Sequence, residues 1–447
     1  MARANYLAQF YGKSQNYTDI PNIWYKEYNV KKGLRNEDGT GVRIGLTRVS
    51  DVVGYEKTDE GVKPVPGRLV YRGYDIEDLI LGKRGSHFGY EETCFLLLFG
   101  YLPKQQEFEE FCKIMRKCYT IPDDFVEMNL LRMPGKNLMN KLQDAVLTLY
   151  NYDDDPDNTD VYETLCKGVN LVAKLPIIAC YAYWSKRHYY DRDSLFIHYA
   201  NPEFSIAENF LSLLRRDQSF TEKEANLLDT LFVLHADHGG GNNSTFTNVV
   251  ISSTGTDIYS TVSGSIGSLK GPRHGGANIK VAEMMDAVLE ETGGWDADDK
   301  AIRKAVEALN DKKLYDRTGL IYGFGHAVYT VSDPRGELLR ECCKVVAKEK
   351  KKEHELDFYM RFERIVKEVM LERKGKALPS NVDFYSGFAY EMLQIPRDLY
   401  TPLFVCSRLV GWVAHNIENK LYDGRIMRPA TKYVGESLEY VKMEERA

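Results

Sequence analysis

The sequence predicts a mainly α-helical protein with a few short strands, and three observations support this fold class. First, Thr221 is followed three residues later by Glu224, which is the capping-box pattern of a helix start, and leucines follow at 227, 228, 231 and 234. Second, glycine-rich breaks separate further apolar stretches of helical length. Third, no alternating strand pattern of comparable length occurs in the chain.

The expected elements follow in chain order. Residues 1–50 are polar and tyrosine-rich, which indicates an extension, and a short β-like run at Leu69–Tyr71 precedes an acidic helix start. Beyond residue 270, breaks and helices are expected to alternate: break 271–278, helix 279–291, break 322–335, helix 336–350, break 376–387 and a helix around 401–419. No low-complexity linker occurs. A second domain should therefore pack against the first, with the ligand site in the cleft between them.

Composition restricts the class of protein. The chain has 447 residues, of which 43% are hydrophobic and 28% charged, and it contains 35 glycines and 15 prolines. These values are typical of an ordered globular protein of two or three domains and exclude disorder, collagen and coiled-coil rods. The 59 Lys and Arg against 65 Asp and Glu give a net charge of −6, which argues against nucleic acid or an anionic membrane as the main partner.

The chain carries eight cysteines without a CxxC pair, so disulfides are not expected. The N-terminal residues contain no apolar signal region, and we find no run of about 18 apolar residues that could span a membrane. These features indicate a reducing compartment, and a cytoplasmic location is the expectation.

Histidines beside glycines are the first candidates for chemistry. His235 and His238 are three residues apart, so both are expected on one helix face, with Gly239 ending the helix. They are either a core histidine and a capping histidine, or His238 faces a ligand. Their spacing and the intervening Asp237 do not suit zinc, so no metal site is expected.

Two further histidines lie in glycine-rich breaks. His274 precedes two glycines and an expected helix start, where backbone N–H groups can hold an anion. It could equally be a turn histidine facing solvent. His326 ends the segment YGFGH (322–326), and neither segment has the residue order of a phosphate-binding loop.

Charged residues in apolar surroundings complete the candidates. Asp383 lies between Val382 and Phe384, so it is either a general base with a raised pKa or a helix N-cap. Arg408 lies inside an apolar helix and needs an anionic partner, which would be a ligand carboxylate or a structural salt bridge. Arg428 is a further arginine, and it precedes a proline.

Six segments, in this order, resemble the citrate synthase family: LHADHGGGNNS (234–244), SLKGPRHGGAN (268–278), YGFGHAVYTVSDPR (322–335), SNVDFYSG (380–387), SRLVGW (407–412) and RPATKYVG (428–435). The resemblance covers about residues 67–435. It implies an almost all-helical two-domain architecture with a few short strands, assembled as a homodimer. The implied parts are an extension (1–50), a large domain (51–277 and 389–447) and a small domain (278–388).

The resemblance also implies an activity, namely the condensation of acetyl-CoA with oxaloacetate followed by hydrolysis of the thioester, without a metal or a permanently bound cofactor. Asp383 matches the base that removes a methyl proton from acetyl-CoA. His274 matches the donor to the thioester oxygen, and His326 matches the donor to the oxaloacetate carbonyl. The close alternative is a 2-methylcitrate synthase that uses propionyl-CoA. A second alternative is a non-catalytic relative that binds dicarboxylates or acyl-CoA.

Binding residues follow from the same resemblance. The residues that match oxaloacetate or citrate contacts are His238, Arg335, Arg408 and Arg428, the last supplied by the neighbouring subunit. The expected CoA contacts are Tyr322, Gly323, Phe324, Gly325, Ala327 and Val328. Gly239, Arg273 and Thr330 depart from familiar members of the family. CoA contacts are therefore expected only from the segment 322–330.

Overall fold

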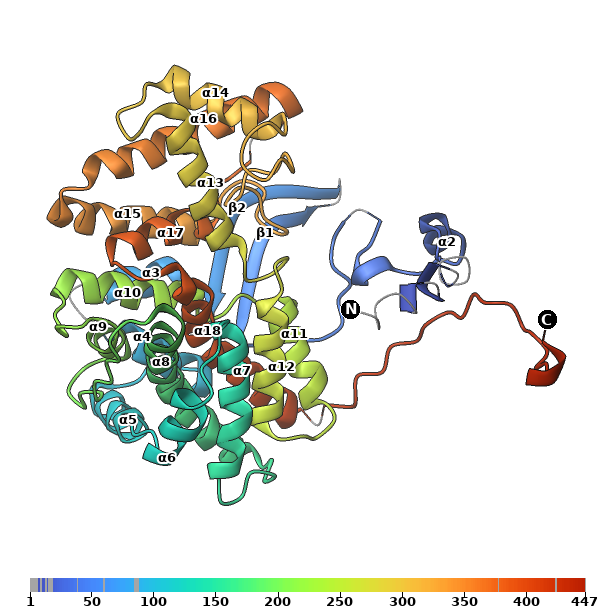
Figure 1. The fold of residues 1–447 in the computed structure, drawn as a ribbon, viewed down its shortest axis with the longest axis horizontal. Coiled ribbons are helices and arrows are strands. Elements are labelled where there is room, and N and C mark those ends of the chain that lie inside the picture. Colours follow the sequence, from blue (N-terminus) through green and yellow to red (C-terminus); the bar gives the residue numbers. More distant parts are fainter. Residues whose placement is uncertain are drawn as a thin grey trace. The chain divides into compact units, whose positions relative to one another are not determined.

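Helices dominate the larger of two units into which the chain divides (Figure 1). The larger unit is Thr47–Ile426, and the smaller one joins Met1–Leu46 to Met427–Ala447. The computed structural model describes residues 7, 8, 10–12, 14, 19–37, 39–58, 61–83, 88–376, 378–422 and 424–446. The expected extension, residues 1–50, thus falls largely in the smaller unit, which contains α2 (Asn22–Glu27) and the short 3-10 helices η1 (Lys32–Leu34) and η5 (Met443–Glu445).

The larger unit begins with three strands, β1 (Ser50–Thr58), β2 (Gly61–Tyr71) and β3 (Tyr74–Asp75). Its helices are α3 (Ile76–Gly82), α4 (Gly89–Phe99), α5 (Gln105–Lys117), α6 (Asp123–Phe125), η2 (Val126–Leu131), α7 (Leu138–Leu149), η3 (Tyr150–Tyr152), α8 (Val161–Asp191), α9 (Ile206–Leu214), α10 (Glu222–His235), α11 (Asn243–Ser252), α12 (Ile258–Lys270), α13 (Ala277–Thr292), α14 (Asp299–Asn310), α15 (Pro334–Lys350), α16 (Glu353–Lys374), α17 (Val382–Met392), η4 (Arg397–Leu399) and α18 (Tyr400–Leu421). The mainly α-helical class is therefore confirmed.

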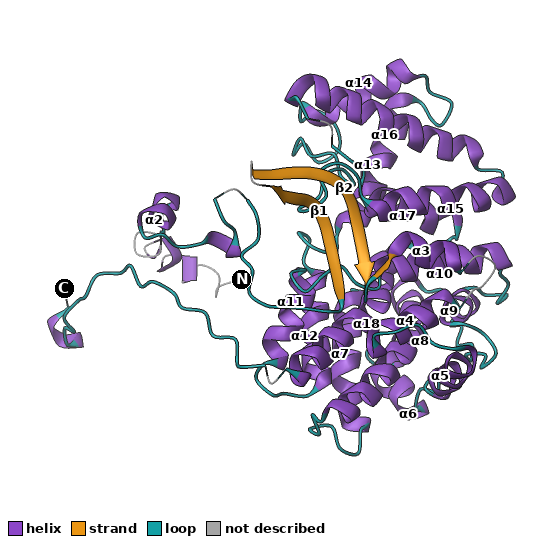
Figure 2. Cartoon of the chain, turned by 180° about the vertical axis from the view of Figure 1, so that it is seen from behind, coloured by secondary structure: helices purple, strands orange, loops and turns teal. Residues whose placement is uncertain are grey.

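The strands are longer than the short run expected at Leu69–Tyr71. Strands β1 and β2 form an antiparallel hairpin that pairs Ser50 with Tyr71, and a register shift interrupts the ladder between Val53 and Tyr55. Strand β2 contains two prolines, at 64 and 66, which cannot donate to a ladder and which obscure the alternating pattern of a strand. Figure 2 shows the hairpin (orange) running from the helices around α18 toward α13 and α17.

Local capping signals place the helix starts as expected. The Thr221 hydroxyl accepts from the Glu224 N–H, and the Glu224 carboxylate accepts from the Thr221 N–H, so the predicted capping box at the start of α10 is confirmed. Asp333 caps α15 and is followed by Pro334 at the first helical position, while Asn381 caps α17. Arg335 and Asp383 therefore both lie in the first turn of a helix.

The core of the larger unit contains α8 and α18, which pack against each other. From Tyr400 to Glu418 nearly every residue of α18 is buried. Helix α8 is long and apolar enough to cross a membrane, contrary to the sequence expectation that no stretch is, but 78% of its apolar window is buried inside the protein. That burial is typical of a core helix. Helices α13 to α17 also pack among themselves. The domain boundaries at 277 and 388 stay a prediction.

Candidate active site

The chain leaves helix α10 directly after His235, so His235 and His238 do not share a helix face as the spacing suggested. His235 is 1% exposed, and its Nδ1–H donates to the Leu231 carbonyl over 2.8 Å. Burial lowers the pKa of His235 to about 3, as expected for a neutral core histidine. His238 lies beyond the helix end, where Gly239 takes a φ of 81°.

His238 is buried, and its Nε2 has no hydrogen-bond partner among the residues that the structure describes. Its ring meets the edge of the His326 ring, with centroids 5.0 Å apart. Burial first, and then the positive charge of Arg335, lower the pKa of His238 well below its usual range. His238 is thus a neutral histidine with an unused ring nitrogen.

Arg408 is completely buried in α18 with most of its hydrogen-bonding capacity unused. Its Nε donates to the His235 carbonyl over 2.6 Å, whereas Nη1 and Nη2 have no partner in the described part of the chain. Burial lowers the pKa of Arg408 to about 10, so the group still carries its charge at neutral pH. A buried guanidinium with two unpaired nitrogens suits a carboxylate, which accepts two parallel N–H bonds.

Arg335 is buried too, but a carboxylate of the protein already binds it. Its Nε and Nη2 bind the two oxygens of Asp333 at 3.0 and 2.7 Å. Asp333 also accepts the Val382 N–H at 3.3 Å, so it ties the start of α15 to the start of α17. Nη1 is not engaged by Asp333, and this nitrogen is the part of Arg335 that remains for a ligand.

Asp383 projects from the first turn of α17. Burial raises the pKa of Asp383 to about 6, although the charges of Arg335 and Arg408 act in the opposite direction. A carboxylate with this pKa is ionised at neutral pH and is a stronger base than an exposed aspartate. The structure therefore agrees with the environment that the apolar neighbours Val382 and Phe384 indicated.

His274 lies in the turn between α12 and α13 and contacts Ser244. The Ser244 backbone N–H donates to His274 Nε2 over 3.3 Å, and the Ser244 hydroxyl lies 3.1 Å from the same nitrogen. Because Nε2 accepts a backbone N–H, the ring proton is on Nδ1. Burial lowers the pKa of His274 to about 4. The residue is a neutral donor through Nδ1, and the Trp412 indole N–H holds the Ser244 hydroxyl in place at 3.2 Å.

His326 has the opposite tautomer. Its Nδ1 accepts the backbone N–H groups of Val328 and Tyr329, each at 3.0 Å, so the ring proton is on Nε2. Burial, followed by the charge of Arg335, lowers the pKa of His326 to about 4. The Tyr329 ring stacks on the imidazole with centroids 4.6 Å apart. His326 is therefore a second neutral donor, with Nε2–H as the donating group.

Most residues of the expected CoA segment are half-buried. Tyr322 donates to Asp316 over 2.6 Å, and Lys280 lies 5.7 Å from the centre of its ring. Phe324 packs against Phe384, and Gly323 and Gly325 take positive φ values. Of the remaining two expected contacts, Ala327 is exposed and Val328 is half-buried. Contact of these residues with CoA stays a prediction.

Arg428 belongs to the smaller unit and is exposed. Its contribution to the active site of a neighbouring subunit stays a prediction.

Several residues that hold the site were not among the sequence candidates. Asp237, considered in the sequence only as an obstacle to zinc, is fully buried and accepts from Ser50, Gly239 and His415. Ser244 and Asp333 had local signals, since Ser244 lies in the first turn of α11, Asp333 caps α15, and both belong to the quoted motifs. Tyr329 lies in the segment 322–330, which was expected only to contact CoA, and its contacts with His238 and Arg335 depend on the tertiary structure.

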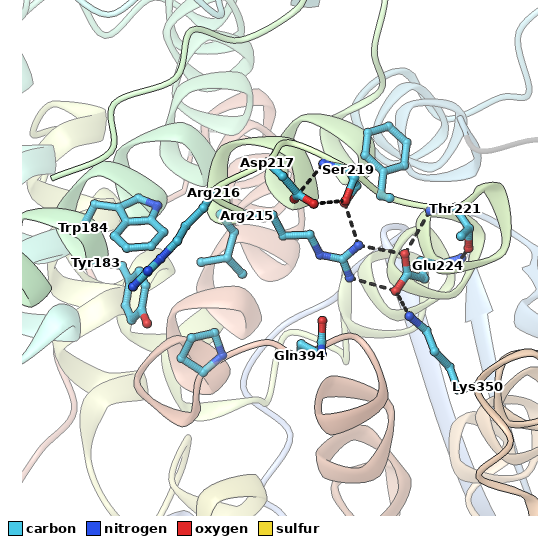
Figure 3. A pocket seen from close by; sticks show the side chains of 13 residues that line it. Tyr183, Trp184, Arg215, Arg216, Asp217, Ser219, Thr221, Glu224, Lys350 and Gln394 are labelled. Atoms are coloured by element: carbon cyan, nitrogen blue, oxygen red, sulfur yellow. Dashed lines mark hydrogen bonds and ion pairs between the residues drawn. The ribbon is translucent and has the colours of Figure 1, made fainter. Parts of the chain in front are cut away.

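A cavity of about 600 Å³ shares no lining residue with this site (Figure 3). Arg215 and Lys350 in its wall both bind the carboxylate of Glu224. Among the residues that the structure describes, no group of three or more His, Cys, Asp or Glu could hold a metal ion.

Fold and site together define a helical protein with neutral buried histidines, a buried carboxylate of raised pKa and a buried guanidinium that uses only its Nε within the described residues. The family model described as citrate synthase, C-terminal domain, matches residues 38–430. The citrate synthase of Haloferax volcanii is 35% identical over 390 residues, which are 85% of this chain and 93% of that protein. The 2-methylcitrate synthase 1 of Corynebacterium glutamicum is 34% identical over 91% of this chain and 98% of its own.

A solved structure agrees with these relatives. The crystal structure of citrate synthase from Pyrobaculum aerophilum superposes with a TM-score of 0.74 at 29% identity, covering 91% of this chain and 94% of that one. The chain belongs to the citrate synthase family.

Proposed function

We propose that the protein condenses acetyl-CoA with oxaloacetate and water to give citrate and CoA. The observation that carries the proposal is the pair of neutral histidines with opposite tautomers. His274 is held at Nε2 and donates through Nδ1, whereas His326 is held at Nδ1 and donates through Nε2. Two neutral donors and one buried carboxylate match a reaction that activates two carbonyl groups and removes one weakly acidic proton.

In the first step, Asp383 removes a proton from the methyl group of acetyl-CoA. This proton is very weakly acidic, so the charge that develops on the thioester oxygen has to be stabilised as the proton leaves. His274 donates Nδ1–H to that oxygen. The raised pKa of Asp383, about 6, makes the carboxylate a better proton acceptor while leaving it ionised at neutral pH.

In the second step, the enolate carbon attacks the oxaloacetate carbonyl and forms the new carbon–carbon bond. His326 polarises this carbonyl through Nε2–H and stabilises the alkoxide as it forms. Water then attacks the thioester carbonyl, the carbon–sulfur bond breaks, and CoA leaves as the thiol. The steps use proton transfers and N–H donors, so the proposal includes no metal and no resident cofactor.

The oxaloacetate carboxylates need cations and N–H donors that are already desolvated. Arg408 supplies Nη1 and Nη2, Arg335 supplies Nη1, and His238 supplies its unused ring nitrogen. We propose that Arg428 completes the set from the neighbouring subunit of a homodimer, and that residues 322–328 contact CoA. We also propose that the protein acts in the cytoplasm. Closure of the small domain over oxaloacetate would exclude water from the enolate.

The test is the release of free CoA thiol when purified protein is mixed with acetyl-CoA and oxaloacetate. We expect steady release that depends on both substrates. Folded protein that releases no thiol at neutral pH would refute the proposal. Omission of oxaloacetate is the control, because it separates condensation from simple thioester hydrolysis.

A 2-methylcitrate synthase activity is the second candidate, because a relative of that name is as similar to this chain as the citrate synthase is. The two reactions differ by one methylene in the acyl group, which changes binding by only about 1 to 3 kcal/mol. A comparison of kcat/KM for acetyl-CoA and propionyl-CoA distinguishes them. A higher value for propionyl-CoA would favour this second candidate.

A further inference from the structure

Tyr329 is completely buried at the centre of the candidate site and contacts three of its residues. Its ring stacks on His326 at 4.6 Å with an interplanar angle of 26°. It meets the His238 ring edge-on at 5.5 Å, and the Arg335 guanidinium lies 5.8 Å from its centre. One aromatic ring thus forms a common support for the donors expected to bind oxaloacetate.

The hairpin β1–β2 packs against the backbone around Tyr329 through two glycines. A Cβ atom at Gly54 would lie 2.3 Å from the Val328 carbonyl oxygen, and one at Gly67 would lie 2.1 Å from the Ser332 carbonyl oxygen. Both distances are far below van der Waals contact, so no side chain fits at either position. The Gly67 N–H also lies 3.3 Å from the Ser332 hydroxyl. The hairpin therefore holds the segment that follows His326.

The base of the same hairpin holds the turn that carries His238. The Ser50 hydroxyl donates to the Asp237 carboxylate. The Tyr71 hydroxyl lies 3.1 Å from the Val233 carbonyl and 3.0 Å from the Asp237 carbonyl. Since a hydroxyl donates one proton, it shares that proton between these acceptors while it accepts the Asp237 N–H at 3.1 Å. The hairpin is thus hydrogen-bonded to the segment that carries His238 and packs tightly against the segment that follows His326.

We propose that Tyr329 is a positioning residue for the oxaloacetate half of the reaction, and that the β1–β2 hairpin seats it through Gly54 and Gly67. The inference rests on the function proposed above. The ring fixes the plane of His326, so that Nδ1 receives both backbone N–H groups and Nε2–H points to the ligand. It also keeps water from His238 and Arg335, because a fully buried aromatic ring fills the space behind them.

The experiment compares Tyr329→Leu, Tyr329→Phe, Gly54→Ala and Gly67→Ala with wild type. Gly82→Ala is the matched control, because a Cβ at Gly82 meets nothing within 4 Å. Each folded variant is assayed for kcat, for KM of both substrates and for oxaloacetate affinity by calorimetry. We expect Tyr329→Leu and the two hairpin variants to weaken oxaloacetate binding on the order of tenfold or more, with a much smaller change in KM for acetyl-CoA.

The pH profile gives a readout that a general loss of stability would not move. In wild type, the acid limb of kcat/KM should involve one proton near pH 6, because Asp383 has a pKa of about 6 and His326 one of about 4. In Tyr329→Leu, water reaches His326 and its pKa rises toward the ordinary value of 6.5. The acid limb should then steepen to two protons. Tyr329→Phe keeps the ring and should restore the wild-type profile.

The outcomes are distinguishable. If wild type releases no thiol and does not bind oxaloacetate, the proposed function is wrong. If wild type is active and Tyr329→Leu keeps its oxaloacetate affinity and a one-proton acid limb, the positioning role is wrong. Should Tyr329→Leu fail to fold, Gly67→Ala decides, since wild-type parameters in that variant would also overturn the role of the hairpin.

Discussion

The chemistry of the site depends on the protonation states that single residues adopt once they are buried. The pKa values of His274 and His326 fall to about 4 mainly because burial disfavours the imidazolium. Burial acts in the opposite sense on a carboxyl, so the pKa of Asp383 rises to about 6. Above about pH 6, and hence at neutral pH, both imidazoles are neutral while the carboxylate of Asp383 is charged. The same physical effect therefore sets both halves of the acid–base pair.

At this scale, Asp383→Asn is expected to lower kcat on the order of a thousandfold, because an amide cannot accept the methyl proton. Oxaloacetate affinity, measured by calorimetry, should change little, since Asn keeps the shape of the side chain. The control is Asp78→Asn, an exposed aspartate in α3. An equal loss of turnover and of oxaloacetate binding would show that Asp383 binds substrate rather than removing a proton.

At the scale of the element, helix starts deliver the functional groups. Asp333 caps α15, binds both Nε and Nη2 of Arg335 and accepts the first-turn N–H of Val382 in α17. Asn381 caps α17, and its amide donates to the Gly325 carbonyl over 2.9 Å, which connects the helix to the His326 segment. The caps thus bring Arg335, Asp383 and His326 into one region.

We expect Asp333→Ala to lower the free energy of unfolding by about 3 to 5 kcal/mol, because it leaves the buried Arg335 without a counterion. Urea denaturation measures this loss. The matched control is Asp298→Ala, which removes the exposed cap of α14 and should cost about 1 kcal/mol. Equal losses in the two variants would mean that Asp333 acts only as a cap.

At the scale of the whole larger unit, Glu224 joins segments that are far apart in the chain (Figure 3). Its carboxylate binds Arg215 at 2.7 and 2.9 Å and also binds Lys350 at the end of α15. Arg215 in turn donates to the Leu393 carbonyl after α17. Glu224 therefore connects the start of α10 to the end of α15 directly, and to the end of α17 through Arg215. The opposite ends of these three helices lie at or next to the candidate site.

Glu224→Gln is expected to lower the free energy of unfolding by about 2 kcal/mol at neutral pH. Burial opposes ionisation of Glu224, but the bonds from Arg215, Lys350 and Thr221 outweigh it and lower its pKa from 4.5 to about 2. A depressed carboxyl pKa stabilises the fold above the unfolded value, and that stabilisation is lost as pH falls from about 4.5 toward 2.

The difference in free energy of unfolding between wild type and Glu224→Gln, measured by urea titration, should therefore shrink as the pH falls from about 4.5 toward 2. The control is Glu109→Gln, an exposed residue that accepts a hydrogen bond from Gln105 within α5 and should cost a few tenths of a kcal/mol. A difference that stays constant down to pH 2 would show that the charge of Glu224 does not matter.

Much of the fold and the site could be predicted from the sequence, because the relevant signals are local. The capping box at Thr221, the helix over 336–350 and the apolar helix around Arg408 follow from neighbours within a few residues. The strands were underestimated, since the prolines of β2 obscure their alternation. The order of the motifs indicated the family, which the comparisons confirm.

The tertiary structure alone decided which groups are buried, which nitrogen carries each proton and which charges are already paired. The family resemblance implied a ligand carboxylate for Arg335 and Arg408 alike, yet Asp333 binds Arg335, while two nitrogens of Arg408 have no partner among the described residues. The support that Tyr329 gives could not be predicted, because its ring meets His238 and Arg335 and the β1–β2 hairpin packs against it. Desolvation and hydrogen-bond geometry depend on atoms brought together from distant segments, whereas motifs and caps depend on the chain's own neighbours.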